Sequence, residues 1–284
     1  MKDQAVLLRQ TLAGYPRVRA GAQGPPTLVV GSGKGGVGKS LVTVLLGAAL
    51  AARHRRVLLV DGSQNLGSLH IMLGVRPVAR LDDLFTGTGA PADLITPVAQ
   101  GLWLLPAECG SESLYALPPL DRARLHHRLA SVFDEFDVVL VDAGEGLEGV
   151  VRVANVRATD ALVVTTPEPA ALSGAYALLK MLSLQVPGLA TEVLVNRAHT
   201  EPEAAAAHRK LAIASDRFLN RELALAGSVL ENESLRALAA APRRLTDGAY
   251  DGPGVSVLRR IAEQWTLRRS ESCEPFSESQ ALVG

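Results

Sequence analysis

The eight residues Gly33–Ser40, which read GKGGVGKS, constrain the fold of this chain more than any other feature. They match the phosphate-binding pattern G-x-x-x-x-G-K-[ST] in full. An apolar run at Leu28–Val30 precedes them and a helical pattern begins at Lys39, so the loop should join a buried strand to a helix. A loop of this kind turns backbone N–H groups toward phosphate oxygens, and the dipole of the following helix adds to the attraction. The chain is therefore predicted to bind a nucleotide.

The loop also supplies side chains for the phosphates and for a metal ion. Lys39 should reach the β- and γ-phosphates, and the Ser40 hydroxyl should hold Mg²⁺. We expect ATP with Mg²⁺ as the ligand. The alternative, a plain glycine-rich turn between strand and helix, does not explain the complete motif. The predicted nucleotide-binding residues of the loop are Gly33, Gly35, Gly36, Val37, Gly38, Lys39 and Ser40.

Apolar runs of strand length alternate with helical patterns along the chain. The runs are mostly continuous, which is typical of strands buried on both faces. Strand–helix alternation with right-handed crossovers predicts an α/β fold: a mostly parallel, twisted sheet with helices on both faces, in three layers. The predicted strands are Thr27–Gly31, Arg56–Asp61, Leu102–Leu105, Asp137–Asp142, Ala161–Thr165, Glu192–Asn196 and, more weakly, Leu223–Val229. The predicted helices are Lys39–Arg53, Asp121–Phe133, Leu147–Val156, Ala170–Leu184 and Glu201–Phe218.

The composition divides the chain into four parts. Residues 1–13 show a short amphipathic helical pattern, and residues 14–26 form a linker rich in Gly, Pro and Arg. The nucleotide-binding domain is predicted over 27–269, and the Ser- and Glu-rich residues 270–284 are predicted to be a disordered tail. Within the domain, Gly254–Arg269 carries an apolar stripe that fits either the last core helix, which we favour, or a helix on a membrane surface.

Charge and cysteine content narrow the classes of function. The 29 basic and 29 acidic side chains cancel, so global charge gives no footprint for nucleic acid. Cys109 and Cys273 lie far apart without metal-ligand spacing, which fits free thiols in a reducing cytoplasm. No apolar run is long enough to span a bilayer and no signal peptide is visible. We expect a cytoplasmic protein with, at most, peripheral contact with the inner face of the membrane.

Two aspartates end predicted strands, where ligand sites of such sheets lie. Asp61 follows Val57–Val60, and Asp142 ends the run in DVVLVDAGEG, which resembles a Walker B motif. Both are expected near Mg²⁺ together with Ser40. The alternative for either aspartate is a structural role in capping the strand end.

Lys34 is a second lysine in the phosphate-binding loop, and it indicates a particular class of P-loop protein. It follows the first glycine of the loop, and KGGVGKS resembles the deviant Walker A motif of the MinD/ParA class of P-loop ATPases. In that class this lysine reaches the phosphates of a partner subunit, which implies an ATP-dependent homodimer and a catalytic set of Lys34, Lys39, Asp61 and Asp142. Asn196, in LVNRA, is at the position where an asparagine of this class often contacts adenine. The alternative, which we weigh equally, is that Asn196 only forms a turn at the strand end.

The sequence departs from this class after its second strand. Relatives usually read Asp-x-Asp there, and the second aspartate is associated with positioning the attacking water, whereas this chain reads Asp61-Gly62-Ser63. A neutral hydroxyl cannot accept a proton as a carboxylate does. The rate of ATP hydrolysis is therefore left open, with Glu145 the candidate substitute and Gln64 and Asn65 also nearby in sequence.

Three stretches resemble one branch of the class, the FlhG family (also FleN or YlxH) of MinD-like regulators of flagellar number and placement. They are TTPEPAALSGAYALLK at Thr165–Lys180, RFLNRELALAGSVLEN from Arg217, and DQAVLLR at Asp3–Arg9. The last matches D-Q-A-x-x-L-R, the N-terminal motif of that family.

In the FlhG family the N-terminal motif docks on FlhF, a flagellar signal-recognition-type GTPase, and stimulates it. The resemblance implies that Gln4 would assist the GTPase site while Asp3 and Arg9 anchor the helix. Ala5 and Leu8 share its apolar face. The linker at 14–26 suits this role because it separates the helix from the core.

Several other interpretations remain beside a nucleotide-switched regulator. A degenerate scaffold would bind ATP and barely hydrolyse it. A ParA-type partitioning ATPase would need a basic surface, for which Arg243, Arg244, Arg259 and Arg260 are the candidates. An iron–sulfur reductase is rejected because only Cys109 is suitably placed, and no second substrate pocket for a biosynthetic ligase is evident.

Overall fold

The computed structural model describes residues 24–62, 67, 69–79, 91–106, 132–144, 158–240 and 252–272. Eight strands among these residues form one twisted sheet in the order β3-β4-β2-β5-β1-β6-β7-β8. Every neighbouring pair is parallel except β3 and β4, which are antiparallel. The strands are β1 Thr27–Gly31, β2 Val57–Gly62, β3 Thr96–Ala99, β4 Leu102–Leu105, β5 Val138–Ala143, β6 Asp160–Thr165, β7 Ala190–Ala198 and β8 Ala224–Leu230.

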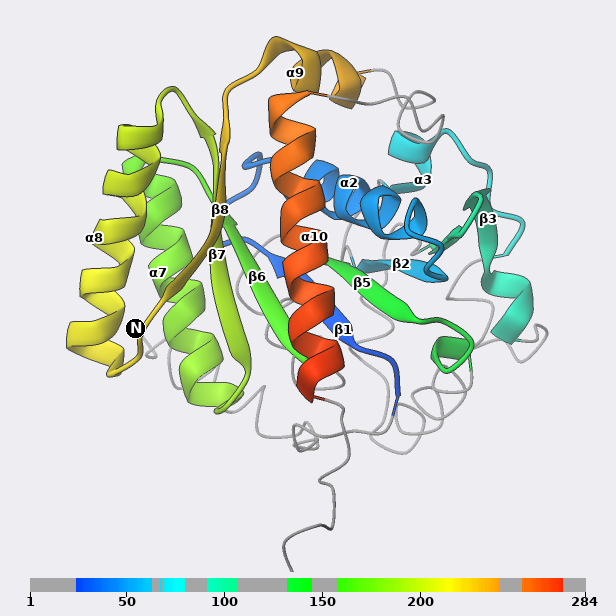
Figure 1. Ribbon diagram of the computed structural model, residues 1–284, viewed down its shortest axis with the longest axis horizontal. Helices are drawn as coiled ribbons and strands as arrows, with labels where there is room; N and C mark the ends of the chain where they lie inside the picture. Colours follow the sequence, from blue (N-terminus) through cyan, green and yellow to red (C-terminus); the bar gives the residue numbers. More distant parts are fainter. Residues whose placement is uncertain are drawn as a thin grey trace, which may run out of the picture.

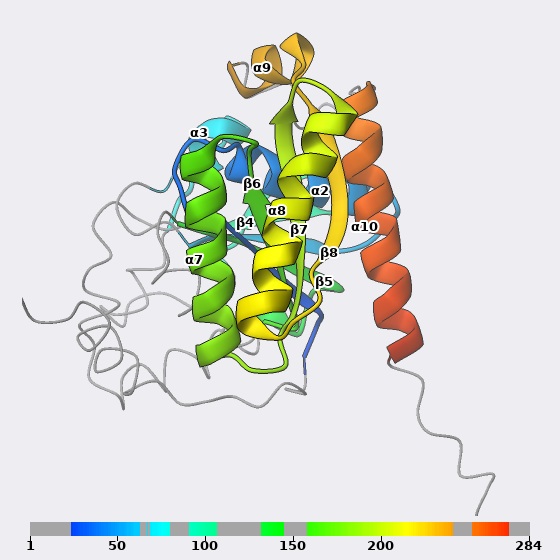
Figure 2. The same cartoon turned by 90° about the vertical axis from the view of Figure 1, so that its left-hand side faces the viewer.

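Helices cover both faces of the sheet. Helices α2 and α10 lie side by side on one face, and α7 and α8 lie side by side on the other (Figures 1 and 2). The predicted three-layer α/β architecture is thus confirmed. The helices are α2 Lys39–Ala51, α3 Leu69–Leu73, α7 Pro169–Gln185, α8 Glu201–Leu219, α9 Glu233–Ala240 and α10 Pro253–Ser272, with a 3-10 turn at Pro91–Leu94.

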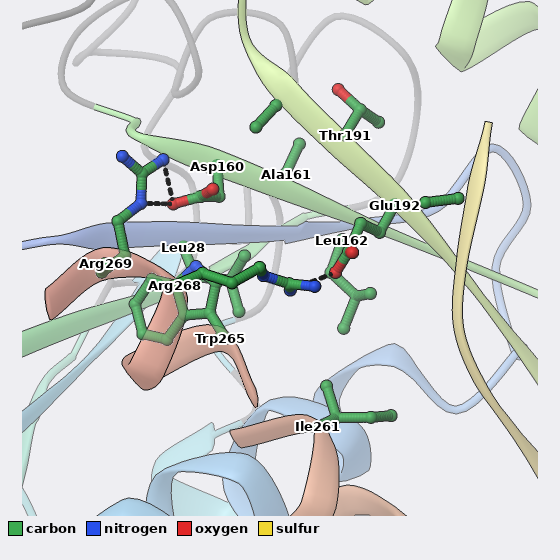
Figure 3. A pocket seen from close by; sticks show the side chains of 12 residues that line it. Leu28, Asp160, Ala161, Leu162, Thr191, Glu192, Ile261, Trp265, Arg268 and Arg269 are labelled. Carbon is green, nitrogen blue, oxygen red and sulfur yellow. Dashed lines mark hydrogen bonds and ion pairs between the residues drawn. The ribbon is translucent and has the colours of Figure 1, made fainter. Parts of the chain in front are cut away.

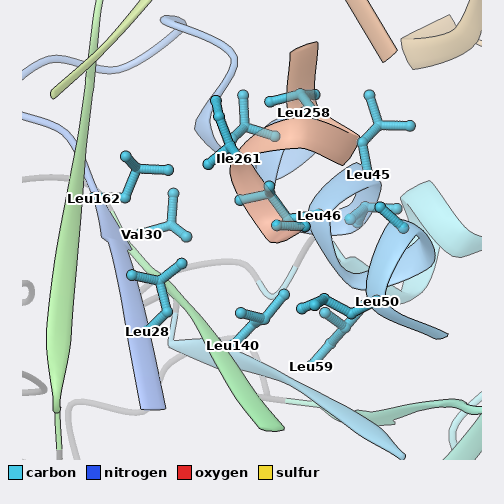
Figure 4. Packing of buried hydrophobic residues seen from close by; sticks show 14 of the residues in the cluster. Leu28, Val30, Leu45, Leu46, Leu50, Leu59, Leu140, Leu162, Leu258 and Ile261 are labelled. Carbon is cyan, nitrogen blue, oxygen red and sulfur yellow. The ribbon is translucent and has the colours of Figure 1, made fainter. Parts of the chain in front are cut away.

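The apolar residues of the strands belong to two separate hydrophobic cores, one on each face of the sheet. Successive strand residues point to opposite faces, so Leu28 and Val30 of β1 pack toward α2 and α10, while Val29 joins the core under α7 and α8. Leu46 of α2 and Ile261 of α10 belong to the same core as Leu28 and Val30 (Figure 4). A sheet covered on both faces needs apolar residues at every strand position, which explains why the predicted strands read as continuous runs.

The stripe of helix α10 belongs to this core. Leu258, Ile261 and Trp265 are buried in the core between the sheet and α2, and Val255 is also buried. The favoured interpretation of Gly254–Arg269 as the last core helix is therefore confirmed over the alternative of a membrane-surface helix. Among the described helices none is long and apolar enough to cross a membrane.

The predicted strands match the structure to within two residues at each end, and three predicted helices match equally well. The predicted helix Leu147–Val156 and most of Asp121–Phe133 lie outside the described residues. Strand β3 was not predicted, because Pro97 interrupts its short pattern; a proline is tolerated there since β3 is an edge strand. Helices α3 and α9 were also missed.

Helix α10 continues to Ser272, so residues 270–272 are helical although they were predicted as the start of a disordered tail. The sequence pattern ended too early because the apolar stripe stops at Trp265. The last turns are instead tied to the sheet by ion pairs of Arg268 with Glu192 and of Arg269 with Asp160. The tail beyond 272 and residues 1–23 lie outside the described residues.

Candidate functional site

The glycine-rich loop connects β1 to α2, as its sequence predicts. The loop follows the last residue of β1, and β1 lies between β5 and β6 and is parallel to both. The loop therefore lies at the carboxyl ends of these strands. Gly36 and Gly38 have φ angles of 76° and 88°, in the left-handed region that favours glycine. Lys39 and Ser40 begin helix α2, so the N-terminus of this helix and the loop face the same site.

The lysine of the loop and the Walker B-like aspartate form a buried ion pair. Lys39 Nζ lies 2.6 Å from Asp142 Oδ1, and the two side chains are 9% and 0% exposed. The second carboxylate oxygen, Oδ2, is buried without a hydrogen-bond partner in the described part of the chain. A buried carboxylate oxygen left unsatisfied is costly, so Asp142 is prepared to accept a further donor or a cation.

Asp61 stands beside Asp142 on the neighbouring strand. The two aspartates are paired in the register of β2 and β5, and Asp61 is 2% exposed. Its Oδ2 accepts a hydrogen bond from the backbone N–H of Leu69 at 3.0 Å, which anchors the start of α3. Asp61 thus has a structural contact at this edge, whatever else it binds.

Ser40, Asp61 and Asp142 offer the hard oxygen atoms that Mg²⁺ prefers, and the unsatisfied Oδ2 of Asp142 fits such an ion. The described residues contain no group of three or more His, Cys, Asp or Glu side chains that could hold a metal alone. In many magnesium sites one or two carboxylates share the ion with water and substrate phosphates.

Lys34 forms an ion pair within its own chain. Its Nζ lies 2.6 Å from Oε2 of Glu168, the residue before α7, and both side chains are largely exposed, at 42% and 54%. The hydrogen bond from Lys34 and its positive charge hold the pKa of Glu168 below its ordinary value. Exposed ion pairs contribute little to stability because water screens them, so Lys34 can be released at small cost.

Helix α7 also packs its backbone directly on the loop. A Cβ atom on Gly33 would lie 2.0 Å from the carbonyl carbon of Gly174, and one on Gly174 would lie 2.6 Å from the carbonyl oxygen of Gly33. Both positions therefore require glycine. Gly174 was not predicted as a site residue, although an isolated glycine inside a helical pattern was a signal that could have identified it.

Two neighbouring residues of β7 bind the outer side of the loop. Asn196 Nδ2 donates to the carbonyl oxygen of Val37 at 2.8 Å, and Arg197 Nη1 donates to that of Gly36 at 3.2 Å. Asn196 was a predicted site residue, and its suggested contact with adenine stays a prediction. Arg197 was missed, because no local pattern shows that a strand-end arginine turns toward the loop.

Several predicted residues lie outside the described part of the chain. They are Ser63, Gln64, Asn65 and Glu145 near the expected γ-phosphate, the N-terminal motif with Asp3, Gln4, Ala5, Leu8 and Arg9, both cysteines, and the arginines Arg243 and Arg244. Their suggested roles stay predictions.

A cavity of about 400 Å³ lies away from this site, between α10 and the amino-terminal ends of β6 and β7. Figure 3 shows Trp265 and Ile261 facing it from α10. Arg268 and Arg269 border it and reach Glu192 and Asp160, each at 2.7 Å. Since β6 and β7 begin here, the cavity is at the opposite edge of the sheet from the phosphate loop.

The loop between β1 and α2, the buried Lys39–Asp142 pair and the central parallel sheet define a nucleotide-binding protein of the P-loop class. Within this class, residues 28–240 match the family model of the CobQ/CobB/MinD/ParA nucleotide binding domain. The chain belongs to this family, and the predicted fold and P-loop ATPase class are confirmed.

Individual relatives agree with this assignment. The chain is 35% identical to the antiactivator FleN of Pseudomonas aeruginosa over 244 residues, which cover 84% of this chain and 87% of that protein. It is 29% identical to the flagellum site-determining protein YlxH of Helicobacter pylori, over 73% of this chain and 70% of that protein.

Solved structures support the same fold. The cell division ATPase MinD of Pyrococcus furiosus superposes with a TM-score of 0.68 at 25% identity, over 86% of this chain and 99% of that one. MinD of Pyrococcus horikoshii in complex with Mg-ADP gives the same TM-score at 24% identity, over 88% of this chain and 100% of that one.

Replacing Lys39 tests the buried pair. Lys39→Met leaves the Asp142 carboxylate buried without its positive partner, so we expect the free energy of unfolding in urea to fall by about 3–5 kcal/mol. Adding Asp142→Asn removes the stranded charge and should recover part of this loss. A double variant no more stable than Lys39→Met would show that Lys39 does not balance a carboxylate charge on Asp142.

Replacing Gly174 tests the contact between helix and loop. Gly174→Ala gains up to about 1 kcal/mol of helix propensity, but the added Cβ meets the Gly33 carbonyl and must displace the loop at a cost of about 1–3 kcal/mol. We expect the affinity for ADP to fall about tenfold in calorimetric titration. Ser173→Ala, at an exposed position in the same turn, is the matched control. Equal affinities of the two variants would contradict the prediction.

Proposed function

We propose that this chain is an ATP-dependent switch of the FlhG type, which controls flagellar number or placement. The proposal is supported chiefly by the combination of Lys34 in the loop with similarity to FleN over 84% of the chain. FleN is named an antiactivator and YlxH a flagellum site-determining protein. The first name describes a regulator, and the second describes a protein that acts on the site of the flagellum.

ATP and Mg²⁺ are the proposed ligands of the loop. The amides of the loop would bind the phosphate oxygens, and Ser40, Asp61 and Asp142 would hold the metal directly or through water. Magnesium supplies positive charge against the phosphates when it is bound. Lys39 would then divide its charge between Asp142 and the β- and γ-phosphates, since it already lies at the loop.

Dimerisation is the proposed response to ATP. Lys34 would leave Glu168 and reach the phosphates bound by a partner subunit, as the resemblance implies. Breaking the Lys34–Glu168 pair costs little free energy, because the pair is exposed and screened by water. A triphosphate offers Lys34 a denser negative charge than one carboxylate does, so binding of ATP would favour the dimer.

Hydrolysis is proposed to be slow, because Ser63 replaces the usual carboxylate. Glu145, with Gln64 and Asn65, would be the groups left to orient the attacking water. A slow ATPase would keep the dimer assembled for longer after each binding event. If turnover is negligible, the same site would serve as an ATP-binding scaffold, which is the second candidate function.

The proposed partner is an FlhF-like GTPase, bound through the N-terminal motif. Gln4 would contribute to the GTPase site, with Asp3 and Arg9 as anchors and Ala5 and Leu8 packing on the partner. DNA partitioning is not favoured, since the zero net charge offers little attraction for a phosphate backbone.

Sizing by light scattering tests the switch. The protein with Mg²⁺ should be a dimer in ATP and a monomer in ADP or without nucleotide. Lys34→Ala should bind ATP yet remain monomeric, because it loses the charge that reaches across the interface. Glu168→Gln, which removes the partner of Lys34 within the chain, should still dimerise. A wild-type monomer under all three conditions would rule out the switch.

Phosphate release tests the proposed slow hydrolysis. Ser63→Asp restores a carboxylate that can orient water, and we expect the rate to rise on the order of 100-fold, the lower end of what a positioned general base supplies. Ser63→Ala is the control and should leave the wild-type rate nearly unchanged. A wild type as fast as Ser63→Asp would refute the slow ATPase and the scaffold together.

A further inference from the structure

Strand β7 contains an irregularity where it meets the phosphate loop. Its register with β8 runs from Asn196 paired with Val229 to Ala198 paired with Leu230, so Arg197 is skipped. Arg197 has a φ angle of 58°, in the left-handed region. This is the geometry of a bulge, which bends a strand and changes the direction of a side chain.

The bulge places two successive side chains on one target. In a regular strand Asn196 and Arg197 would point to opposite faces of the sheet. Here Asn196 donates to the carbonyl oxygen of Val37 and Arg197 donates to that of Gly36. Two adjacent donors of β7 therefore hold two adjacent carbonyl groups of the loop.

Holding these carbonyl groups also orients the amides that a phosphate needs. In a trans peptide the C=O of one residue and the N–H of the next are coplanar and point in opposite directions. Fixing the Gly36 carbonyl outward therefore directs the Val37 N–H inward, and the Val37 carbonyl does the same for the Gly38 N–H. Glycines at 36 and 38 leave these peptide planes easy to rotate, so without outer donors the amides would lack a fixed direction.

The guanidinium of Arg197 is itself held from the other side. Its Nε donates to Glu231 Oε2 at 3.2 Å, and Glu231, 18% exposed, also accepts a hydrogen bond from Arg236 of α9. The backbone N–H of Glu231 donates to the Ala198 carbonyl at 2.7 Å, next to the bulge. Although partial burial of Glu231 opposes ionisation, hydrogen bonds from the two arginines hold the pKa of its carboxyl below the ordinary value.

The backbone at Arg197 is strained in a way that its side chain explains. Non-glycine residues seldom adopt positive φ, and such strain tends to persist where the surroundings fix it for a function. Glycine would adopt this φ freely but would offer no donor to the loop. The hydrogen bonds of Arg197 with the Gly36 carbonyl and with Glu231 compensate for the strain of this conformation.

We propose that Arg197 is a positioning residue for nucleotide binding: it orients the inward amides of the phosphate loop by holding the Gly36 carbonyl, and Glu231 keeps it in place. The inference rests on the proposed binding of ATP and adds the group that organises the loop before the nucleotide arrives. Arg197 acts through the backbone of the loop and needs no contact with the nucleotide itself.

Calorimetric titration with Mg-ADP tests this role, since ADP avoids both hydrolysis and dimerisation. Arg197→Ala should bind ADP about tenfold more weakly, as expected for loss of one hydrogen bond from a charged donor. Arg197→Gly relieves the strained φ and should show the same loss, because it lacks the same donor. Arg197→Lys keeps one donor and should recover part of the affinity. Arg209→Ala, on the exposed face of α8, is the control and should bind as the wild type does.

Glu231→Gln tests the support of Arg197. We expect a smaller loss of ADP affinity than in Arg197→Ala, and a double variant that binds no more weakly than Arg197→Ala alone, since Glu231 acts through the arginine. Fully additive losses would overturn this link.

Thermal unfolding without nucleotide separates positioning from general damage. Arg197→Gly should unfold close to the wild type because strain is relieved, while its ADP affinity still falls. If Arg197→Gly and Arg197→Ala bind ADP as tightly as the wild type, the positioning role is wrong. If the wild type itself fails to bind ADP, the proposed nucleotide switch fails as well, and the two failures are thereby distinguished.

Discussion

The buried ion pair between Lys39 and Asp142 is the interaction on which the nucleotide edge of this protein depends. Taking both charges out of water is costly, and the pair is tolerable because its partners lie 2.6 Å apart on elements that the core fixes. Lys39 begins α2, and Asp142 belongs to β5, which pairs with β1 directly below the loop. The pair therefore sets the position of the loop relative to β5, whose Asp142 is proposed to hold the metal ion together with Ser40.

The surroundings of the loop follow from the same geometry. The carbonyl groups of Gly36 and Val37 face the protein, where such groups need donors. Asn196 and Arg197 supply them from β7, while the paired glycines Gly33 and Gly174 let α7 approach from the other side. Lys34 is the exception, since its exposed partner Glu168 holds it weakly. The rigid contacts suit binding, and the weak one suits a group that changes partners.

The sequence identified the elements that carry a local signal. The motif at Gly33–Ser40 and the continuous apolar strands were recognisable because each depends on spacing within a few residues. Asp61 and Asp142 were identified by their place at strand ends. Gly174 and Arg197 were missed because their roles depend on contacts with residues more than 140 positions away in the chain. Strand β3 was missed because Pro97 interrupts its pattern, and helices α3 and α9 were too short to show a helical period.

By itself the sequence determined that this chain would form a parallel α/β sheet with a phosphate loop after its first strand. Burial on both faces of a sheet requires a composition that is visible along the chain, and the loop requires glycines at fixed spacing. The tertiary structure decided how the loop is held: by Asp142 beneath it, by α7 at Gly174, and by a bulge in β7 that directs Asn196 and Arg197 to neighbouring carbonyl groups. These contacts join strands and helices distant in sequence, so only the packing of the whole sheet could specify them.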